Sequence, residues 1–313
     1  MGGLATVGHA GGGLDRRTAL LLDRIPGAER YRHVRARPRS TGRGGVVSTK
    51  IVQLTTKDTG WKYLGVEVVS LAAGDRLDLD SPTHETAVVL VEGAVEVHGA
   101  GLDARIHRGS VFAEMAEIAY VPPKQRVTVA AVADSEIALG TAPAAGLHPA
   151  RLVRRHEMAS VVRGGGPAVR QVTSPLADPI PAESLIVYEA WVPRGGYAGW
   201  PPHRHDGADG SPYLEETYYF RFDRDVGFGW HRNFAADLDL DDSFSIRNRS
   251  LVAVPAGYHL CTAGPAANMW ILNFLAGAPE DRAQPPCFDP AETWINEDWT
   301  RGQLPIPAVD PRK

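Results

Sequence analysis

The sequence predicts an all-β protein with two tandem antiparallel β-barrels of the jelly-roll type. Two observations support this fold class. Short apolar or alternating runs, separated by Gly, Pro and Asp, fill the chain after residue 46, and a proline turn recurs at the corresponding place in each half. Such closely spaced runs favour an antiparallel sandwich or barrel over a succession of strand–helix–strand units.

The first barrel is expected over residues 47–160. Residues 1–46 are rich in glycine and arginine and predict a flexible N-terminal extension, in which Asp15 to Ile25 would form a short helix. The strands expected in the first barrel are Leu64–Leu71, Thr86–Val91, Ala94–Val97, Ser110–Phe112, Ala119–Val121, Val127–Val132 and Glu136–Leu139.

The second barrel is expected over residues 161–313, after a passage rich in Gly and Pro from Gly164 to Pro181. Its tail, from Pro285 onward, would dock on the barrel through Trp294 and Trp299. The strands expected here are Leu185–Val192, Leu214–Phe222, Gly227–Asn233, Ser243–Arg247, Leu251–Val254 and Met269–Leu275.

A repeated turn relates the two halves. Val121-Pro122-Pro123 in the first half occupies the place of Val254-Pro255-Ala256 in the second, since each follows a strand and precedes another apolar run. The repeat indicates a duplicated barrel unit.

The composition limits the classes of function. With 313 residues, 43% hydrophobic and 22% charged, and a formal net charge of −4, the chain is typical of a globular protein and offers no electrostatic case for nucleic acid or anionic membrane. It has no apolar run of transmembrane length, and its start lacks a secretory signal pattern. Cys261 and Cys287 lack metal-type spacing, so we expect ordinary thiols and a cytoplasmic location.

The second half carries a candidate metal centre. His203 and His205 are separated by one residue, so on a strand their side chains point to the same face. A third histidine, His259, follows the turn Pro255-Ala256-Gly257, where glycine permits a positive φ. Three imidazoles and a carboxylate with open coordination positions are typical of a catalytic metal site.

The carboxylate comes from Glu215 or Glu216. If Glu216 faces the metal, Tyr218, Phe220 and Phe222 share its face; if Glu215 does, Arg221 is placed inside. A buried guanidinium needs a partner, so Glu216 is the predicted ligand and Glu215 a neighbouring or surface group.

Further residues are candidates for catalysis and substrate binding. Glu216, His231 and Tyr218 are the candidates for a group that transfers a proton. An anionic substrate would be held by arginine through paired hydrogen bonds. The candidate substrate-binding residues are Arg221, Arg232, Arg247 and Tyr258.

These residues resemble the cupin superfamily, whose metal is held by His-x-His, Glu and a later His on a small β-barrel. The chain more specifically resembles the 5-deoxy-glucuronate isomerases of inositol catabolism, which are bicupins related to the 4-deoxy-threo-5-hexosulose-uronate ketol-isomerases. The matching stretches are Gly60-Trp61-Lys62-Tyr63-Leu64-Gly65, Pro201-Pro202-His203-Arg204-His205-Asp206, Leu214-Glu215-Glu216-Thr217-Tyr218-Tyr219-Phe220-Arg221, Val254-Pro255-Ala256-Gly257-Tyr258-His259 and Asn273-Phe274-Leu275-Ala276-Gly277. The N-terminal extension departs from the family pattern.

The resemblance implies metal ligands at His203, His205, Glu216 and His259. It also implies the conversion of 5-deoxy-D-glucuronate to 5-dehydro-2-deoxy-D-gluconate, an aldose–ketose isomerisation through an enediol. One divalent ion is expected, Zn or Mn, with Fe as the alternative. The rival hypotheses are another uronate ketol-isomerase, an iron cupin dioxygenase and a non-enzymatic sugar-binding bicupin. The expected partners are a small sugar acid and further copies of the chain in a homo-oligomer.

Overall fold

The computed structural model describes residues 48–299. The extension predicted for residues 1–46, with its short helix at 15–25, lies outside the described residues, as does the end of the tail. Within residues 48–299, no helix is long and apolar enough to cross a membrane.

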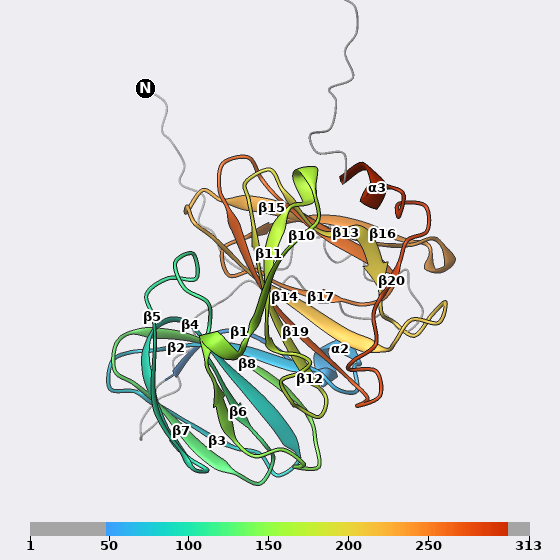
Figure 1. The fold of residues 1–313 in the computed structure, drawn as a ribbon. Helices are drawn as coiled ribbons and strands as arrows, with labels where there is room; N and C mark the ends of the chain where they lie inside the picture. Colours follow the sequence, from blue (N-terminus) through green and yellow to red (C-terminus); the bar gives the residue numbers. More distant parts are fainter. Residues whose placement is uncertain (1–47, 300–313) are drawn as a thin grey trace, which may run out of the picture.

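The N-terminal half is a barrel of antiparallel strands (Figure 1). One layer has the order β1-β2-β8-β4-β6-β9; β5 and β7 pair with β4, and β3 pairs with β7, to form the opposing layer. The elements are β1 (Ser48–Leu54), α2 (Thr56–Thr59), β2 (Gly65–Leu71), β3 (Arg76–Asp80), β4 (His84–Gly99), β5 (Leu102–Arg108), β6 (Ile118–Val121), β7 (Arg126–Ala131), β8 (Ser135–Pro143) and β9 (Arg151–Val153).

The C-terminal half contains two sheets. One has the order β10-β11-β12-β19-β14-β17 and the other β16-β15-β18-β13-β20. The elements are β10 (Ala159–Arg163), β11 (Arg170–Leu176), β12 (Leu185–Val192), β13 (Tyr197–Arg204), β14 (Leu214–Phe222), β15 (Phe228–Ala235), β16 (Leu240–Arg247), β17 (Leu251–Val254), β18 (Tyr258–Ala263), β19 (Met269–Gly277), β20 (Cys287–Phe288) and α3 (Ile295–Trp299), with short 3₁₀ turns at Arg155–Glu157, Gly166–Ala168 and Ala236–Leu238.

The predicted all-β fold of two barrels is confirmed, but three local predictions were wrong. Thr86–Val91 and Ala94–Val97 belong to one continuous strand, β4. At its bend Gly93 has φ 113°, and a Cβ there would lie 2.3 Å from the Ser135 hydroxyl. Ser110–Phe112 is a turn, because the Ser110 carbonyl accepts hydrogen bonds from the N–H groups of Ala113 and Glu114.

Between the two barrels, the Gly- and Pro-rich passage from Gly164 to Pro181 contains strand β11, and the boundary expected at residues 160 and 161 lies within the range of strand β10. The third wrong prediction concerns the tail. Trp294 is 56% exposed and does not dock the tail. The tail is attached instead by β20, which pairs with β13.

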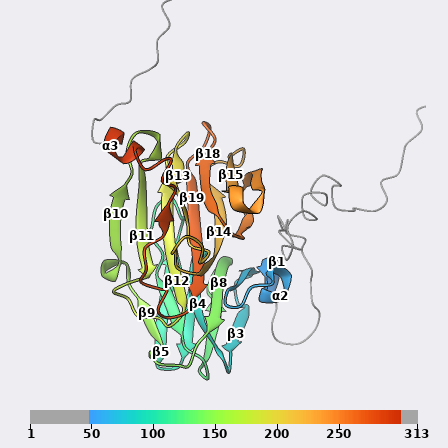
Figure 2. The same cartoon turned by 90° about the vertical axis from the view of Figure 1, so that its right-hand side faces the viewer.

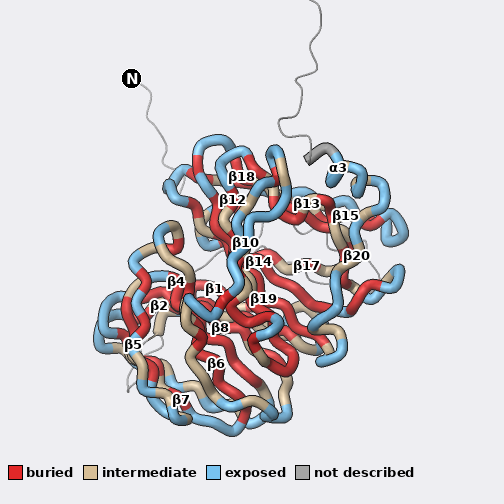
Figure 3. The backbone as a smooth tube through the Cα atoms, viewed as in Figure 1, coloured by how far each residue is buried: buried red, intermediate tan, exposed pale blue. Residues whose placement is uncertain are grey.

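The two barrels are stacked and share one apolar core (Figure 2). Strands β8 and β4 of the N-terminal half pack against β12, β19 and β14, and the chain is mostly buried where the halves meet (Figure 3). Gly140 on β8 makes this approach close, because a Cβ there would lie 2.3 Å from the ring of Phe274 on β19. The core therefore holds the halves together as one unit.

Strand register supports the duplication. In the N-terminal half Thr86 lies opposite Val121 and Thr141; in the C-terminal half Glu216 lies opposite Val254 and Leu275. Thr86 therefore occupies the position of Glu216. Among residues 48–299, the one group of His, Cys, Asp and Glu side chains that could hold a metal lies in the C-terminal barrel.

Candidate metal centre

Three histidines converge inside the C-terminal barrel. His203 lies near the end of β13, His205 follows that strand, and His259 lies on β18 directly opposite His203. One ring nitrogen of each lies within 4.8 Å of one ring nitrogen of both others. The pairing of β13 with β18 thus brings a local His-x-His pair against a histidine more than fifty residues away.

Glu216 completes the group from the opposite sheet. Its Oε2 lies 2.8 Å from Nε2 of His205 and 3.0 Å from Nε2 of His259. Its Oε1 accepts a hydrogen bond of 2.8 Å from the side-chain amide of Asn273 on β19. Glu216 thus faces the barrel interior, together with Tyr218 and Phe220 of the same strand.

Glu215 points to the other face of β14, which is also buried. Only 2% exposed, it accepts hydrogen bonds from the backbone N–H groups of Lys62, Tyr63 and Leu64. The expectation of a neighbouring or surface group was therefore wrong. Glu215 fixes a loop of the N-terminal half against the half that carries the three histidines.

Asp206 connects the two histidine segments. It follows His205 directly, and its Oδ2 accepts a hydrogen bond of 2.6 Å from the N–H of Gly257, two residues before His259. Gly257 has φ 74°, and a Cβ there would lie 2.5 Å from the carbonyl oxygen of Phe234. The guanidinium of Arg204 binds Asp206 through two nitrogens, so the carboxylate is held in place.

The electrostatics of the group suit a cation. Burial alone would raise the pKa of Glu216, but His259 and His205 hold it well below its usual range, so the carboxylate is ionised. Burial and the neighbouring imidazoles lower the pKa of His203 well below its usual value, so this ring is neutral.

The orientation of the rings directs nitrogen atoms to the centre. The ring Nδ1 of His205 contacts the carbonyl oxygen of Leu214 at 2.7 Å, which directs its Nε2 to the centre. Nε2 of His259 lies 3.0 Å from Oε2 of Glu216 and so faces the centre as well. Three imidazoles with one carboxylate are ordinary ligands of divalent transition metals. The donor set therefore fits a divalent metal ion.

Besides the ligand candidate Glu216, both other residues predicted for catalysis lie next to the group. The Tyr218 ring centroid is 5.8 Å from that of His259, and its hydroxyl contacts Glu216 and Asn273. His231 on β15 is fully buried; its ring is parallel to that of His259 at 6.4 Å, and its Nε2 lies 2.6 Å from Oδ1 of Asn233. Burial lowers the pKa of His231 to about 3, so it is neutral.

The three predicted substrate-binding arginines do not reach the histidines. Each alternates on its strand with a side chain that points into the metal-bearing barrel, so it points away from that interior. Arg221 pairs with Glu136 of the N-terminal half at 2.8 Å, and Arg232 pairs with Asp241 on the outer surface. Arg247 is exposed beside the buried Ile246. The prediction for these arginines was therefore wrong.

Tyr258 also lies off the group. It precedes His259 on β18, and the guanidinium of Arg204 lies over its ring at 5.2 Å from the centroid. Its position indicates a structural role in the Arg204–Asp206 network.

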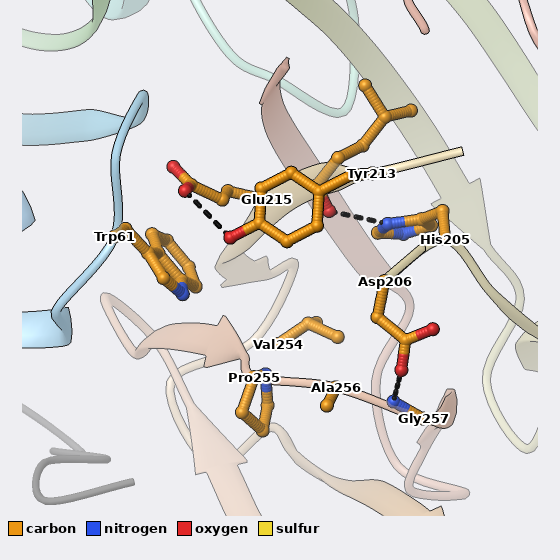
Figure 4. Close-up of a pocket in the computed structure, with 10 residues that line it drawn as sticks. Trp61, His205, Asp206, Tyr213, Glu215, Val254, Pro255, Ala256 and Gly257 are labelled. Atoms are coloured by element: carbon orange, nitrogen blue, oxygen red, sulfur yellow. Dashed lines mark hydrogen bonds between the residues drawn. The ribbon is translucent and has the colours of Figure 1, made fainter. Parts of the chain in front are cut away.

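A small pocket borders the centre on the side of His205. Figure 4 shows Trp61, from the N-terminal half, facing Glu215 and Pro255 across it, with Asp206 bound to Gly257 on the far wall. Sequence reasoning missed this contribution of the first half, and it missed Asn273 and Asp206. The Asp directly after the His-x-His pair was the available signal for Asp206.

The fold and the centre define a bicupin, a chain of two cupin barrels of which one carries the ligand set. The chain belongs to the KduI/IolB family, whose model matches residues 38–295. It is similar to the 5-deoxy-glucuronate isomerases of Geobacillus thermodenitrificans, at 34% identity over 79% of this chain and 91% of the relative, and of Bacillus subtilis strain 168, at 31% identity over 78% and 92%.

Solved structures agree with this assignment. An IolB-like protein from Salmonella typhimurium LT2 superposes with a TM-score of 0.74 at 33% identity, covering 82% of this chain and 97% of that chain. Oxalate decarboxylase from Bacillus subtilis shares the fold at a TM-score of 0.57 and 12% identity, over 80% of this chain and 77% of that one.

Proposed function

We propose that this protein is an aldose–ketose isomerase that converts 5-deoxy-D-glucuronate to 5-dehydro-2-deoxy-D-gluconate in myo-inositol catabolism. The observation that carries the proposal is the convergence of His203, His205, Glu216 and His259 in a member of the KduI/IolB family. The names of the curated relatives support this substrate. The alternative is the reaction of another uronate ketol-isomerase, because the family includes both KduI and IolB proteins.

We propose His203, His205, Glu216 and His259 as ligands of one divalent ion, Zn or Mn, with Fe as the alternative. The arrangement of one carboxylate against three imidazoles supports this set. Such an ion, when bound, acts as a Lewis acid for the substrate carbonyl and the neighbouring hydroxyl.

We propose that Tyr218 and Glu216 take part in the transfer of the proton between the two reacting carbons of the substrate. Burial raises the pKa of the Tyr218 phenol well above its usual value, so it stays protonated and can donate to an oxygen on which charge develops. Glu216 is held by Asn273 and the histidines in one orientation. We assign His231 a positioning role, because it is fully buried and bound to Asn233.

We propose different roles for the two halves of the chain. The N-terminal barrel, about residues 47–160, would act as a structural partner without metal ligands, and residues 161–313 would form the metal-binding barrel with its docked tail. Cys261 and Cys287 are unpaired, which fits a reducing cytoplasm.

We also propose a homo-oligomer, since strand β10 presents an exposed sheet edge. Light scattering on the purified protein would test the oligomeric state.

An NMR time course with 5-deoxy-D-glucuronate tests the function. We expect signals of the 2-deoxy-5-keto acid to appear, to stop on chelation and to return with a divalent metal. If the protein binds stoichiometric metal but does not convert 5-deoxy-D-glucuronate, the proposed substrate is wrong and the proposed metal centre still stands. Other uronates would then be assayed.

Replacement of a ligand gives the first prediction. His259→Ala should lose bound metal and lower turnover at least about a hundredfold, because one of four ligands is removed. Metal content by mass spectrometry and turnover by NMR are measured on the same sample. His98→Ala, at a half-exposed position on β4, is the matched control. Full turnover by metal-free His259→Ala would refute the metal mechanism.

A further inference from the structure

Two arginines lie side by side without an acidic partner. Arg163 on β10 is directly opposite Arg170 on β11, at the edge of the six-stranded sheet (Figure 1). Like charges directly opposite each other destabilise a pair of strands. Within residues 48–299 neither guanidinium forms an ion pair, whereas Arg221 and Arg232 each have a carboxylate partner.

Arg170 points toward the metal centre. It lies two residues from Val172, whose side chain packs on the core of the metal-bearing barrel, so the two side chains share the inner face of β11. Its Nη1 donates to the carbonyl oxygens of Ala168, at 2.9 Å, and Trp200, at 3.5 Å. Trp200 precedes His203 by three residues on β13. Burial and the neighbouring imidazoles lower the pKa of His203, and the charge of Arg170 adds a smaller effect in the same direction.

Arg163 lies on the same face of the sheet as Arg170, at its exposed edge. Directly opposed residues share a face of the sheet, and the charge of Arg163 acts on the hydroxyl of Tyr188 on β12. Tyr188 lies opposite Asn273, which holds Glu216. Tyr188 on β12 and Asn273 on β19 therefore lie between the arginine pair and the ligand carboxylate in the strand order of the sheet.

We infer that Arg163 and Arg170 bind the carboxylate of the sugar-acid substrate while its carbonyl end meets the metal centre. A partly buried cation is stable when an anion accepts its hydrogen bonds, and guanidinium groups bind carboxylates through two parallel bonds. The inference rests on the proposed function and adds the residues that select a uronate over a neutral sugar.

The test compares 5-deoxy-D-glucuronate with 5-deoxy-D-glucose, which has a hydroxymethyl group in place of the carboxylate. Arg170→Met should raise KM for the uronate roughly 10- to 100-fold, since hydrogen bonds to a charged group are lost, and leave kcat/KM for the neutral sugar within about threefold. Arg163→Met, at an exposed position, should raise KM for the uronate by a smaller factor. Arg224→Met, on an exposed turn after β14, is the control and should change neither value.

Stability separates substrate binding from a structural role. If the arginine binds substrate, Arg170→Met should keep the metal content and melt no lower than the wild type, because a like-charge contact is removed. Should Arg170→Met fail to fold, Arg163→Met alone carries the test. An unchanged preference for the uronate in the variant that folds would overturn the inference.

Calorimetric titration keeps the two proposals separate. If the wild type converts no uronate, the proposed function fails, and binding of D-glucuronate against D-glucose is then measured. Preferential binding of glucuronate that Arg170→Met abolishes would support the arginine site; equal binding by wild type and variant would overturn it.

Discussion

At the scale of single residues, the candidate metal centre is defined by the partners of its ligand atoms. Glu216 is held by Asn273 and two histidines, and Nε2 of His259 lies 3.0 Å from its Oε2. Imidazole nitrogens and carboxylate oxygens are both ordinary metal ligands. A metal ion bound between these residues would stabilise the fold by mass action.

His231 gives a prediction about pH. Its folded-state pKa of about 3 lies below the value of 6.5 for a free imidazole. As the pH falls, the unfolded chain therefore takes up this proton first, and the free energy of unfolding decreases between about pH 6.5 and about pH 3. Between pH 7 and pH 5 this one group should remove about 2 kcal/mol.

His231→Gln should flatten that dependence, because Gln keeps a donor for Asn233 and does not titrate. Urea unfolding of the variant and the wild type at both pH values measures the difference. His98→Ala again serves as control. Equal pH dependence of the variant and the wild type would show that folding does not lower the pKa of His231.

At the scale of elements, pairs of segments far apart in the sequence are fixed by single buried carboxylates. Glu215 on β14 accepts three backbone N–H groups of residues 62–64. Glu85, at the corresponding position of β4, accepts three of residues 183–185. Each barrel thus holds a loop of the other, and the same device occurs twice because the barrel unit is duplicated.

Glu215→Gln should lower the free energy of unfolding by about 3 kcal/mol, because a neutral amide with one acceptor oxygen replaces a carboxylate that accepts hydrogen bonds from three backbone N–H groups and the Tyr213 hydroxyl. Denaturant unfolding measures the loss. Glu96→Gln, on the surface of β4 with 42% of its side chain exposed, should change stability by less than about 0.5 kcal/mol. Similar values for both variants would contradict the role of Glu215.

At the scale of the whole molecule, the halves are joined by a buried ion pair as well as by the apolar core. Arg108 of the N-terminal half is 1% exposed and lies 2.6 Å from Glu189 of the C-terminal half, which is 0% exposed. Its guanidinium also donates to the carbonyl oxygens of Leu90 and Glu114. A pair this deep makes unfolding of one half costly for the other.

Arg108→Met should destabilise the protein by about 3–5 kcal/mol, because Glu189 is left as a buried charge without its cation. Tryptophan fluorescence and far-ultraviolet circular dichroism should still report one coincident transition, since the halves share a core. Arg126→Met removes a surface pair in which the arginine is 75% exposed and should have little effect. Two separate transitions in the wild type would contradict a common core.

The sequence alone determined the fold class and the metal candidates, because both depend on local periodicity. Alternation along strands predicts two antiparallel barrels, and a His-x-His pair, a strand carboxylate and a histidine after a proline–glycine turn are each readable within a few residues. Strand β13, which sequence reasoning missed, has an apolar pattern interrupted by Gly and Pro.

Only the tertiary structure decided which charges are compensated. Nothing in the local sequence distinguishes Arg221 from Arg170. In the structure Arg221 forms an ion pair with Glu136 of the other barrel, whereas Arg170 has no acidic partner among the described residues. Glu215 and Glu216 are adjacent, yet one fixes a loop of the N-terminal half and the other faces the histidines. The partners of a buried charge come from segments far apart in the chain, and their proximity is set by how the sheets pack.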